Sequence, residues 1–290
     1  MFPSHPLERS RVDPDFATEY ETAQLSGFGV MLYDDDALRA GDMVTALRQA
    51  SNYQLYDPQE VILRGYMLDY LRYKTLYKGL ETHNLLLVNN PVEYGKAHYW
   101  SAAYKHFKNV AVESFFFPGK DLTHENALRF CESGAWFMKD YVKSAKEKGI
   151  IKDIQDKADF ERAKTDLLEA RGKQFYDGFA LKRYHELSTY TVLGKPQPLE
   201  VRFFFYKGHM VSAAMTHGGD AAFSVAKQFA PSWLPDLVRN FKSNFFTVDI
   251  GWQGRVPYVL ETGDGQVSGL SPDQHSLWFY NELKMIALQS

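Results

Sequence analysis

The chain has 290 residues and a mass of 33.3 kDa, with a formal net charge of −3 and a sequence pI near 6.3. This length is enough for one large core or for two to three lobes, and the charge balance gives no sign of the basic surface that nucleic-acid binding requires. The single cysteine, Cys131, excludes an internal disulfide, which is typical of the reducing cytosol. No apolar run approaches the roughly 18 residues that a membrane span needs. We therefore expect a cytoplasmic protein with no membrane or nucleic-acid partner.

The first third of the chain alternates between helical and strand patterns. Apolar residues recur with the spacing of amphipathic helices, and short apolar runs such as GVMLYD and LLLVNN lie between them. The expected helices cover residues 13–27, 34–46 and 68–84, and the expected strands cover residues 29–34, 61–68 and 85–90. Because strands that alternate with helices favour parallel pairing, we predict a parallel α/β lobe here.

A change of pattern follows between residues 110 and 120. Residues 92–109 are predicted as a helix crowded with Tyr, Trp and His, which we interpret as a packing face. Thr123 is the expected N-cap of the next helix. We predict an amino-terminal domain over residues 1–115 and a second domain over residues 116–290. The second domain would divide into a central lobe of about residues 120–185 and a carboxy-terminal lobe of about residues 186–290.

The second half is rich in strands with turn signals between them. AWFMK begins a strand at Ala135, residues 158–173 form a charged helix, and FALKRYHEL supplies a strand from Phe179. The sequence EVRFFFYKGHMVSAAM predicts a hairpin with its turn at YKGH, and FFTVDIGW and PYVLETG predict a second hairpin. Successive antiparallel strands after an α/β beginning indicate the α+β class.

Several common catalytic signatures are absent. The sequence has no G-x-x-x-x-G-K-[ST] loop and no G-x-S-x-G elbow, so it predicts neither a P-loop enzyme nor an α/β-hydrolase. A lone cysteine removes the usual zinc patterns.

Charged side chains recur instead on the predicted strands of the second half. Lysine and arginine are seldom placed within a strand unless they are paired or bind an anion. Glu200 and Arg202, which are two positions apart, point to the same face of their strand. The residues concerned are Lys139, Lys182, Arg183, Glu200, Arg202, Asp249 and Glu261, with Lys143, Ser144 and Lys146 just beyond the strand of Lys139.

Carboxylates on neighbouring strands, with lysines supplied from elsewhere, match the needs of nucleoside triphosphate chemistry. Mg²⁺ takes one or two protein carboxylates together with phosphate oxygens, and Lys or Arg neutralises the remaining charge. We therefore predict that Asp249 and Glu261 hold Mg²⁺, which in turn holds the phosphates. The alternative is that each carboxylate only caps or pairs at its strand end and that the lysines form a solvated charged run.

The order of these segments resembles the ATP-grasp superfamily, and more narrowly its small arginine- and lysine-patterned clade, known mostly from bacteria and their phages. The resemblance covers almost the whole chain. It rests on LRGYML at Leu63, VNNPVEYGKAH at Val88, FMKDYVKSAKE at Phe137, LEVRFFFYKGHMV at Leu199 and VLETGDGQVSGL at Val259. It implies an α/β amino-terminal lobe followed by two α+β lobes that enclose a nucleotide cleft.

The resemblance also implies a role for each matched residue. Lys139 would meet the nucleotide phosphates and Arg202 the phosphate or the acyl phosphate, which makes these two the expected catalytic residues. Asp249 and Glu261 would bind Mg²⁺. The other expected nucleotide contacts are Lys143 and Ser144 in a phosphate-covering loop that extends towards Lys146, and Lys182, Arg183, Tyr184 and Glu186 in the adenine hinge, with Glu186 at the ribose.

The sequence departs from the family pattern at one metal-binding position. ATP-grasp enzymes usually have Glu-x-Asn, with the Asn as a further metal ligand, but this chain has Gly263 after Glu261 and Thr262. Asp264, one residue later, is the expected replacement ligand.

The activity that the resemblance implies is ATP-dependent carboxylate–amine ligation through an acyl phosphate, with ATP and Mg²⁺ as cofactors. The carboxylate and amine would belong to an amino acid, a peptide or a protein end. The alternative, favoured by Gly263, is a non-catalytic ATP-grasp scaffold that binds a nucleotide or a protein as a regulatory or immunity module.

Overall fold

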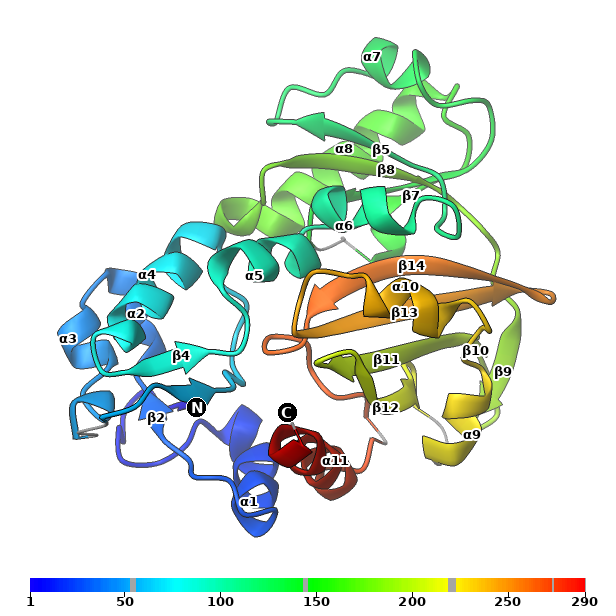
Figure 1. Ribbon diagram of the computed structural model, residues 1–290. Helices are drawn as coiled ribbons and strands as arrows, with labels where there is room; N and C mark the ends of the chain where they lie inside the picture. The colour runs from blue at the N-terminus through cyan, green and yellow to red at the C-terminus, as the bar shows by residue number, and fades with distance from the viewer. Residues whose placement is uncertain (53–55, 143–145, 219–222, 273, 290) are drawn as a thin grey trace.

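The computed structural model of the chain describes residues 1–52, 56–142, 146–218, 223–272 and 274–289. Three lobes follow one another along the chain, coloured blue to cyan, green, and yellow to red in Figure 1. No helix within these described ranges is both long and apolar enough to cross a membrane.

The amino-terminal lobe contains four strands in two parallel pairs. The pairs are β1 (Phe2–Pro3) with β2 (Leu32–Tyr33), and β3 (Gln59–Val61) with β4 (Leu85–Leu87). The two pairs meet at the start of the chain, where the Met1 amine donates to the Ile62 carbonyl and the Arg64 amide donates to the Met1 carbonyl, each at 2.8 Å. The predicted parallel α/β arrangement is therefore confirmed.

Short helices surround these strands, and their ends follow from local sequence. They are η1 (Pro14–Phe16), α1 (Ala17–Leu25), α2 (Asp35–Ala40), α3 (Met43–Ala46), η2 (Ala50–Asn52), α4 (Tyr70–Glu81), α5 (Pro91–His98) and α6 (Trp100–Phe107). The helix predicted over residues 34–46 is interrupted because Gly41 adopts a left-handed conformation and Asp42 caps a new helix. The helix predicted over residues 92–109 is also wrong as one element, since extended backbone at Tyr99 divides it into α5 and α6. The strand predicted over residues 61–68 is confined to β3, which ends at residue 61.

The central lobe is an antiparallel sheet covered by helices. Its strand order is β5 (Ser114–Pro118), β8 (Gly178–Arg183), β6 (Trp136–Asp140) and β7 (Ile150–Ile151). The helices are α7 (His124–Leu128), which Thr123 caps as predicted, α8 (Lys157–Arg171), η3 (Lys146–Gly149) and η4 (Gly172–Gln174). The predicted domain division between residues 115 and 116 falls inside β5 and stays a prediction.

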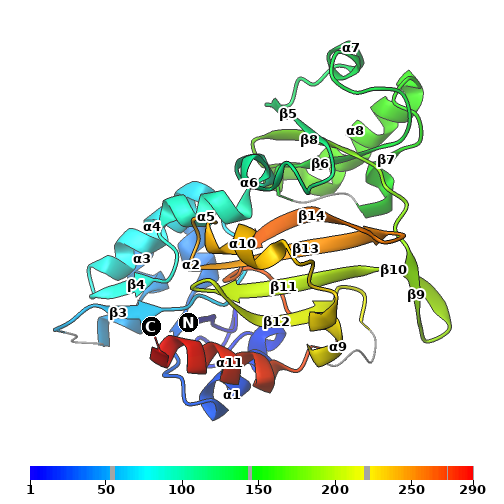
Figure 2. The same cartoon turned by 45° about the vertical axis from the view of Figure 1, so that its right-hand side comes forward.

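The carboxy-terminal lobe contains the antiparallel sheet β12–β11–β13–β14. Its elements are β9 (Thr189–Val192), β10 (Lys195–Pro198), β11 (Glu200–Tyr206), β12 (His209–Met215), α9 (Phe223–Gln228), α10 (Leu234–Arg239), β13 (Phe245–Gln253), β14 (Val256–Asp264) and α11 (Ser276–Gln289). Both predicted hairpins are confirmed as β11–β12 and β13–β14. In Figure 2, the additional hairpin β9–β10 projects beyond the right-hand end of the sheet.

The two faces of this sheet bury different cores. Val201, Phe203 and Val248 pack with side chains of α6 and α10 on one face. Phe204 and Phe245 pack with α11 on the opposite face. Because side chains alternate along a strand, Arg202 and Asp249 point to the same face as Phe204 and Phe245, but nearer the central lobe. The polar residues of the predicted site therefore lie on the α11 side of the sheet.

Candidate functional site

Strand register brings three of the predicted site residues side by side. Arg202 on β11 is the register partner of Asp249 on β13, and Asp249 is in turn the partner of Glu261 on β14. Register partners present their side chains on one face. Arg202 donates two hydrogen bonds to Asp249, from Nε to Oδ1 at 2.8 Å and from Nη2 to Oδ2 at 2.6 Å. The Asp249 carboxylate, at 2% exposure, is thus held by a buried bidentate ion pair.

Two lysines from the central lobe reach the same face. Lys139 on β6 places its Nζ 2.5 Å from the Glu261 carboxylate. Lys182 on β8 is paired with Phe137, two residues before Lys139, so both lysines leave their sheet on one side. The Lys182 ammonium donates to the carbonyl of Leu260, which is an extra residue in β14 at a bulge. The junction of the two sheets therefore gathers three cations and two carboxylates.

Burial in this cluster shifts the pKa of its members in opposite directions. Burial, reinforced by repulsion from Lys139, lowers the pKa of Lys182 to about 7. Burial also disfavours the ionised form of Glu261, but Lys139 and Lys182 outweigh it and hold the pKa of that carboxyl below its usual value. For Asp249, burial raises the pKa, against the opposing effect of Arg202. Such perturbed groups at a junction of lobes are typical of functional sites.

Asp264, the expected replacement ligand, is not brought to this cluster. On β14, Glu261 and Gly263 face Asp249 and Thr247, so Asp264 points to the other side of the sheet. There its buried carboxylate accepts a hydrogen bond from Asn89 Nδ2 at 2.6 Å and another from the Gln266 amide at 2.9 Å. We therefore correct the expectation: Asp264 joins the lobes and does not share a site with Asp249 and Glu261.

The remaining predicted contacts are distributed around the site. Arg183 points away from it, pairs with Glu132 at 3.2 Å and lies over the Trp136 ring, because it alternates with Lys182 along β8. Tyr184 and Glu186 follow the end of β8 with exposed side chains. Lys143 and Ser144 lie outside the described residues, and Lys146 begins η3.

Glu200 is a member of the cluster to which sequence reasoning gave no role. It lies two residues before Arg202 on β11, so it shares the face of Arg202, and its negative charge raises the pKa of Lys182 and Asp249. Its carboxylate lies 3.8 Å from His217 Nε2. The two-residue spacing in Glu-Val-Arg was the signal that places it there.

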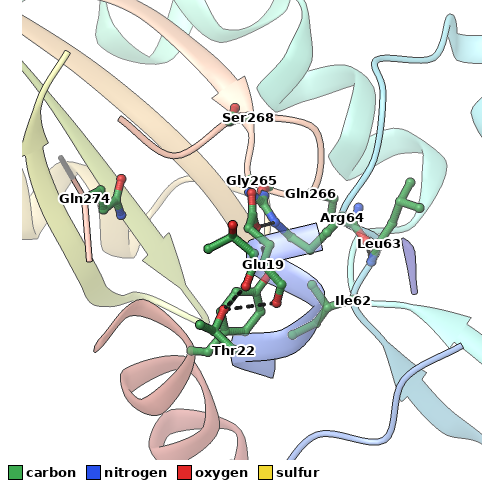
Figure 3. A network of polar contacts seen from close by, with 12 residues as sticks. Glu19, Thr22, Ile62, Leu63, Arg64, Gly265, Gln266, Ser268 and Gln274 are labelled. Carbon is green, nitrogen blue, oxygen red and sulfur yellow. Dashed lines mark hydrogen bonds and ion pairs between the residues drawn. The ribbon is translucent and has the colours of Figure 1, made fainter. Parts of the chain in front are cut away.

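A buried arginine connects the amino-terminal lobe to the loop that follows β14. Arg64, at 2% exposure, contacts both carboxylate oxygens of Glu19 at 2.8 and 3.1 Å, and donates to the Gly265 carbonyl. Tyr280 on α11 donates to the same carboxylate at 2.7 Å. Figure 3 shows Arg64 and Glu19 meeting beside Gly265 and Gln266. Three segments far apart in sequence therefore converge on this loop.

The same loop is held from its other end by the site itself. Arg202 Nη1 donates to the Gly269 carbonyl at 3.2 Å. Between these two anchors, Gln266 accepts from the Leu63 amide through its side chain and from the Gly65 amide through its carbonyl, each at 3.2 Å. Residues 265–269 are thus fixed between the amino-terminal lobe and Arg202.

Comparison with known proteins identifies the arrangement. Residues 124–283 match the model of a family of ATP-grasp domains, family 3 of the arginine- and lysine-patterned clade. The resemblance predicted from the sequence is therefore confirmed. No curated protein matches the chain.

Solved structures resemble the chain over nearly its whole length. D-cycloserine synthetase DcsG shares 14% identity with a TM-score of 0.58, covering 94% of each chain. D-alanine–D-alanine ligase from Bacillus anthracis complexed with ATP shares 12% identity with a TM-score of 0.56, covering 93% of this chain and 92% of that one. The ATP-grasp ligase PsnB, complexed with a variant of a minimal precursor, Mg and ADP, shares 11% identity with a TM-score of 0.57, covering 100% of this chain and 96% of that one. These likenesses confirm the predicted α+β ATP-grasp fold.

Proposed function

Because this chain belongs to the ATP-grasp family whose model its residues 124–283 match, we propose that it is an ATP-dependent ligase that joins a carboxylate to an amine. The observation that carries the proposal is the junction of the two sheets, where Lys139, Lys182 and Arg202 surround the carboxylates of Asp249 and Glu261. Catalysis by charge neutralisation and positioning needs such a cluster rather than a nucleophile–base pair.

The proposed reaction has two balanced steps. A substrate carboxylate oxygen attacks the γ-phosphorus of ATP, the bond from that phosphorus to the bridging β,γ-oxygen breaks, and ADP leaves. The amine then attacks the acyl carbon, the bond to the phosphate oxygen breaks, and the amine loses a proton as inorganic phosphate departs. Lys139, Lys182 and Arg202 would neutralise the transferred phosphate, since each is a cation held on one side of the junction.

The residues present fit a magnesium ion. Asp249 and Glu261 are carboxylates on adjacent strands and on one face, and Mg²⁺ in nucleotide sites is held by one or two carboxylates plus phosphate oxygens and waters. We propose that these two residues hold it, and the ion would neutralise the developing phosphate charge. Within the described residues, no three His, Cys, Asp or Glu side chains gather as a metal site, so the remaining ligands must come from other oxygens.

An amino acid, a peptide or a protein end is the proposed source of the carboxylate and the amine. This choice is supported by the similar solved structures, which include ligases named for D-alanine and a ligase bound to a peptide precursor.

Calorimetric titration of ATP with Mg²⁺, and then with EDTA, tests the proposal. We expect magnesium-dependent binding, and we expect Lys139→Ala and Glu261→Gln each to abolish ATP turnover without loss of fold. The exposed Lys157→Ala on α8 is the matched control and should behave as the unaltered protein. Unchanged turnover in both site variants would refute the site, and binding without turnover under any substrate would favour the non-catalytic scaffold.

A further inference from the structure

Two hydroxyl groups fill the space beside the missing side chain of Gly263. This glycine lies two residues after Glu261 on β14, so it faces the same side, and its partner on β13 is Thr247. A Cβ atom built on Gly263 would lie only 2.5 Å from Ser268 Oγ and 2.8 Å from Thr247 Oγ1. Glycine is therefore needed at this position because the serine of the following loop occupies the place of a side chain.

The protons of these hydroxyls are directed away from the metal-binding face. Ser268 Oγ donates to the Asp264 carbonyl at 2.8 Å. Thr247 Oγ1 lies 3.2 Å from Ser268 Oγ and 3.5 Å from the Gly263 carbonyl. A hydroxyl has one proton and two lone pairs, so a proton committed to a partner leaves lone pairs available to a cation. The pair is thus arranged as oxygen acceptors.

These oxygens continue the row that the two carboxylates begin. Thr247 precedes Asp249 by two residues and Gly263 follows Glu261 by two, so the hydroxyl pair is the next position along the same face, about 7 Å away in strand spacing. A buried hydroxyl such as Thr247, at 1% exposure, costs desolvation that an apolar residue would avoid. Placing two of them here makes a surface of oxygen ligands, which is what Mg²⁺ prefers.

We propose that Thr247 and Ser268 supply the third protein contact of the magnesium site, beside Asp249 and Glu261. This inference rests on the proposed function, because it assumes that Mg²⁺ binds at the carboxylate pair. It replaces Asp264 in that role, since Asp264 points to the opposite face. Ser268 is kept in place by the anchors of its loop, namely Arg64 at Gly265 and Arg202 at Gly269.

Binding of Mn²⁺, measured by electron paramagnetic resonance with and without a non-hydrolysable ATP analogue, tests the inference without any acceptor substrate. Thr247→Val and Ser268→Ala remove only the hydroxyls, and we expect each to weaken Mn²⁺ binding about tenfold or more. Thr247→Ser keeps a hydroxyl and should retain most of the affinity. The exposed Thr191→Val on β9 is the matched control and should leave Mn²⁺ binding unchanged.

The outcomes separate this inference from the function on which it rests. Loss of Mn²⁺ affinity in Thr247→Val and Ser268→Ala, with retention in Thr247→Ser, supports the hydroxyl contact. Normal affinity in both of the first two variants, while Glu261→Gln binds Mn²⁺ poorly, overturns the hydroxyl contact and leaves the proposed function standing. Normal affinity in Glu261→Gln and Asp249→Asn as well, or no Mn²⁺ binding by the unaltered protein, overturns both.

Discussion

Nucleotide binding should be accompanied by uptake of a proton at Lys182. This side chain is 6% exposed and faces Lys139, Glu261, Glu200 and Asp249, and burial together with Lys139 lowers its pKa to about 7. At pH 8 a group with this pKa is about 90% neutral, whereas a polyphosphate beside it favours the ammonium form and returns the pKa towards about 10.4. We therefore expect about 0.9 proton to be taken up per ATP bound at pH 8, and about 0.1 at pH 6.

The sign of the pH dependence follows from this uptake. Because the bound state holds more protons than the free state above pH 7, affinity falls as pH rises, by up to about tenfold per pH unit between pH 7 and 9. Calorimetry at pH 8 in buffers of different ionisation enthalpy gives the proton number from the slope of apparent enthalpy. Lys182→Met should remove most of the uptake, and Lys157→Met should not. A slope of zero in the unaltered protein, or an equal slope in Lys182→Met, would refute this reasoning.

Two further predictions concern stability. Glu19→Ala leaves the buried Arg64 charge without its partner and should lower the free energy of unfolding by about 3–5 kcal/mol in urea titration; the double variant with Arg64→Met should lose less than the single variant, and a cost below about 1 kcal/mol would contradict the buried pair. Leu193, 98% exposed at φ 48° and followed by Gly194 at φ 75°, occupies a hairpin turn that favours Asn-Gly. Leu193→Asn should raise the free energy of unfolding by about 0.5–1 kcal/mol, and a lower midpoint in urea would count against it.

Periodicity and caps were sufficient to predict many elements. Thr123 caps α7 as expected, and the hairpins β11–β12 and β13–β14 follow from alternating apolar residues with a turn between them. Other strands carry no such signal. β1 has only two residues and β10 reads Lys-Pro-Gln-Pro, so both are strands only because a neighbouring strand pairs with them. The aromatic run of β5 was likewise not predicted as a strand.

The candidate site divides in the same way. Two-residue spacing places Glu200 beside Arg202, and this could be read from the sequence. The same rule separates Glu261 from Asp264, so the expectation for Asp264 was wrong on grounds that the sequence already contained. Arg64 could not be predicted in detail, because its partners Glu19 and Gly265 lie 45 and 201 residues away and are brought to it only by the packing of the lobes.

The contacts that join the lobes differ in kind, and this difference bears on how the protein opens. Asn89 fastens the amino-terminal lobe to the carboxy-terminal one through neutral hydrogen bonds to the backbone of Phe245 and a bond to Asp264. The central lobe instead touches β14 through the ammonium groups of Lys139 and Lys182. A nucleotide that engages these lysines must take them from Glu261 and Leu260, so interlobe cohesion and ligand affinity compete for the same charges. The amino-terminal and carboxy-terminal lobes would then move as one body, with the central lobe as the partner that swings.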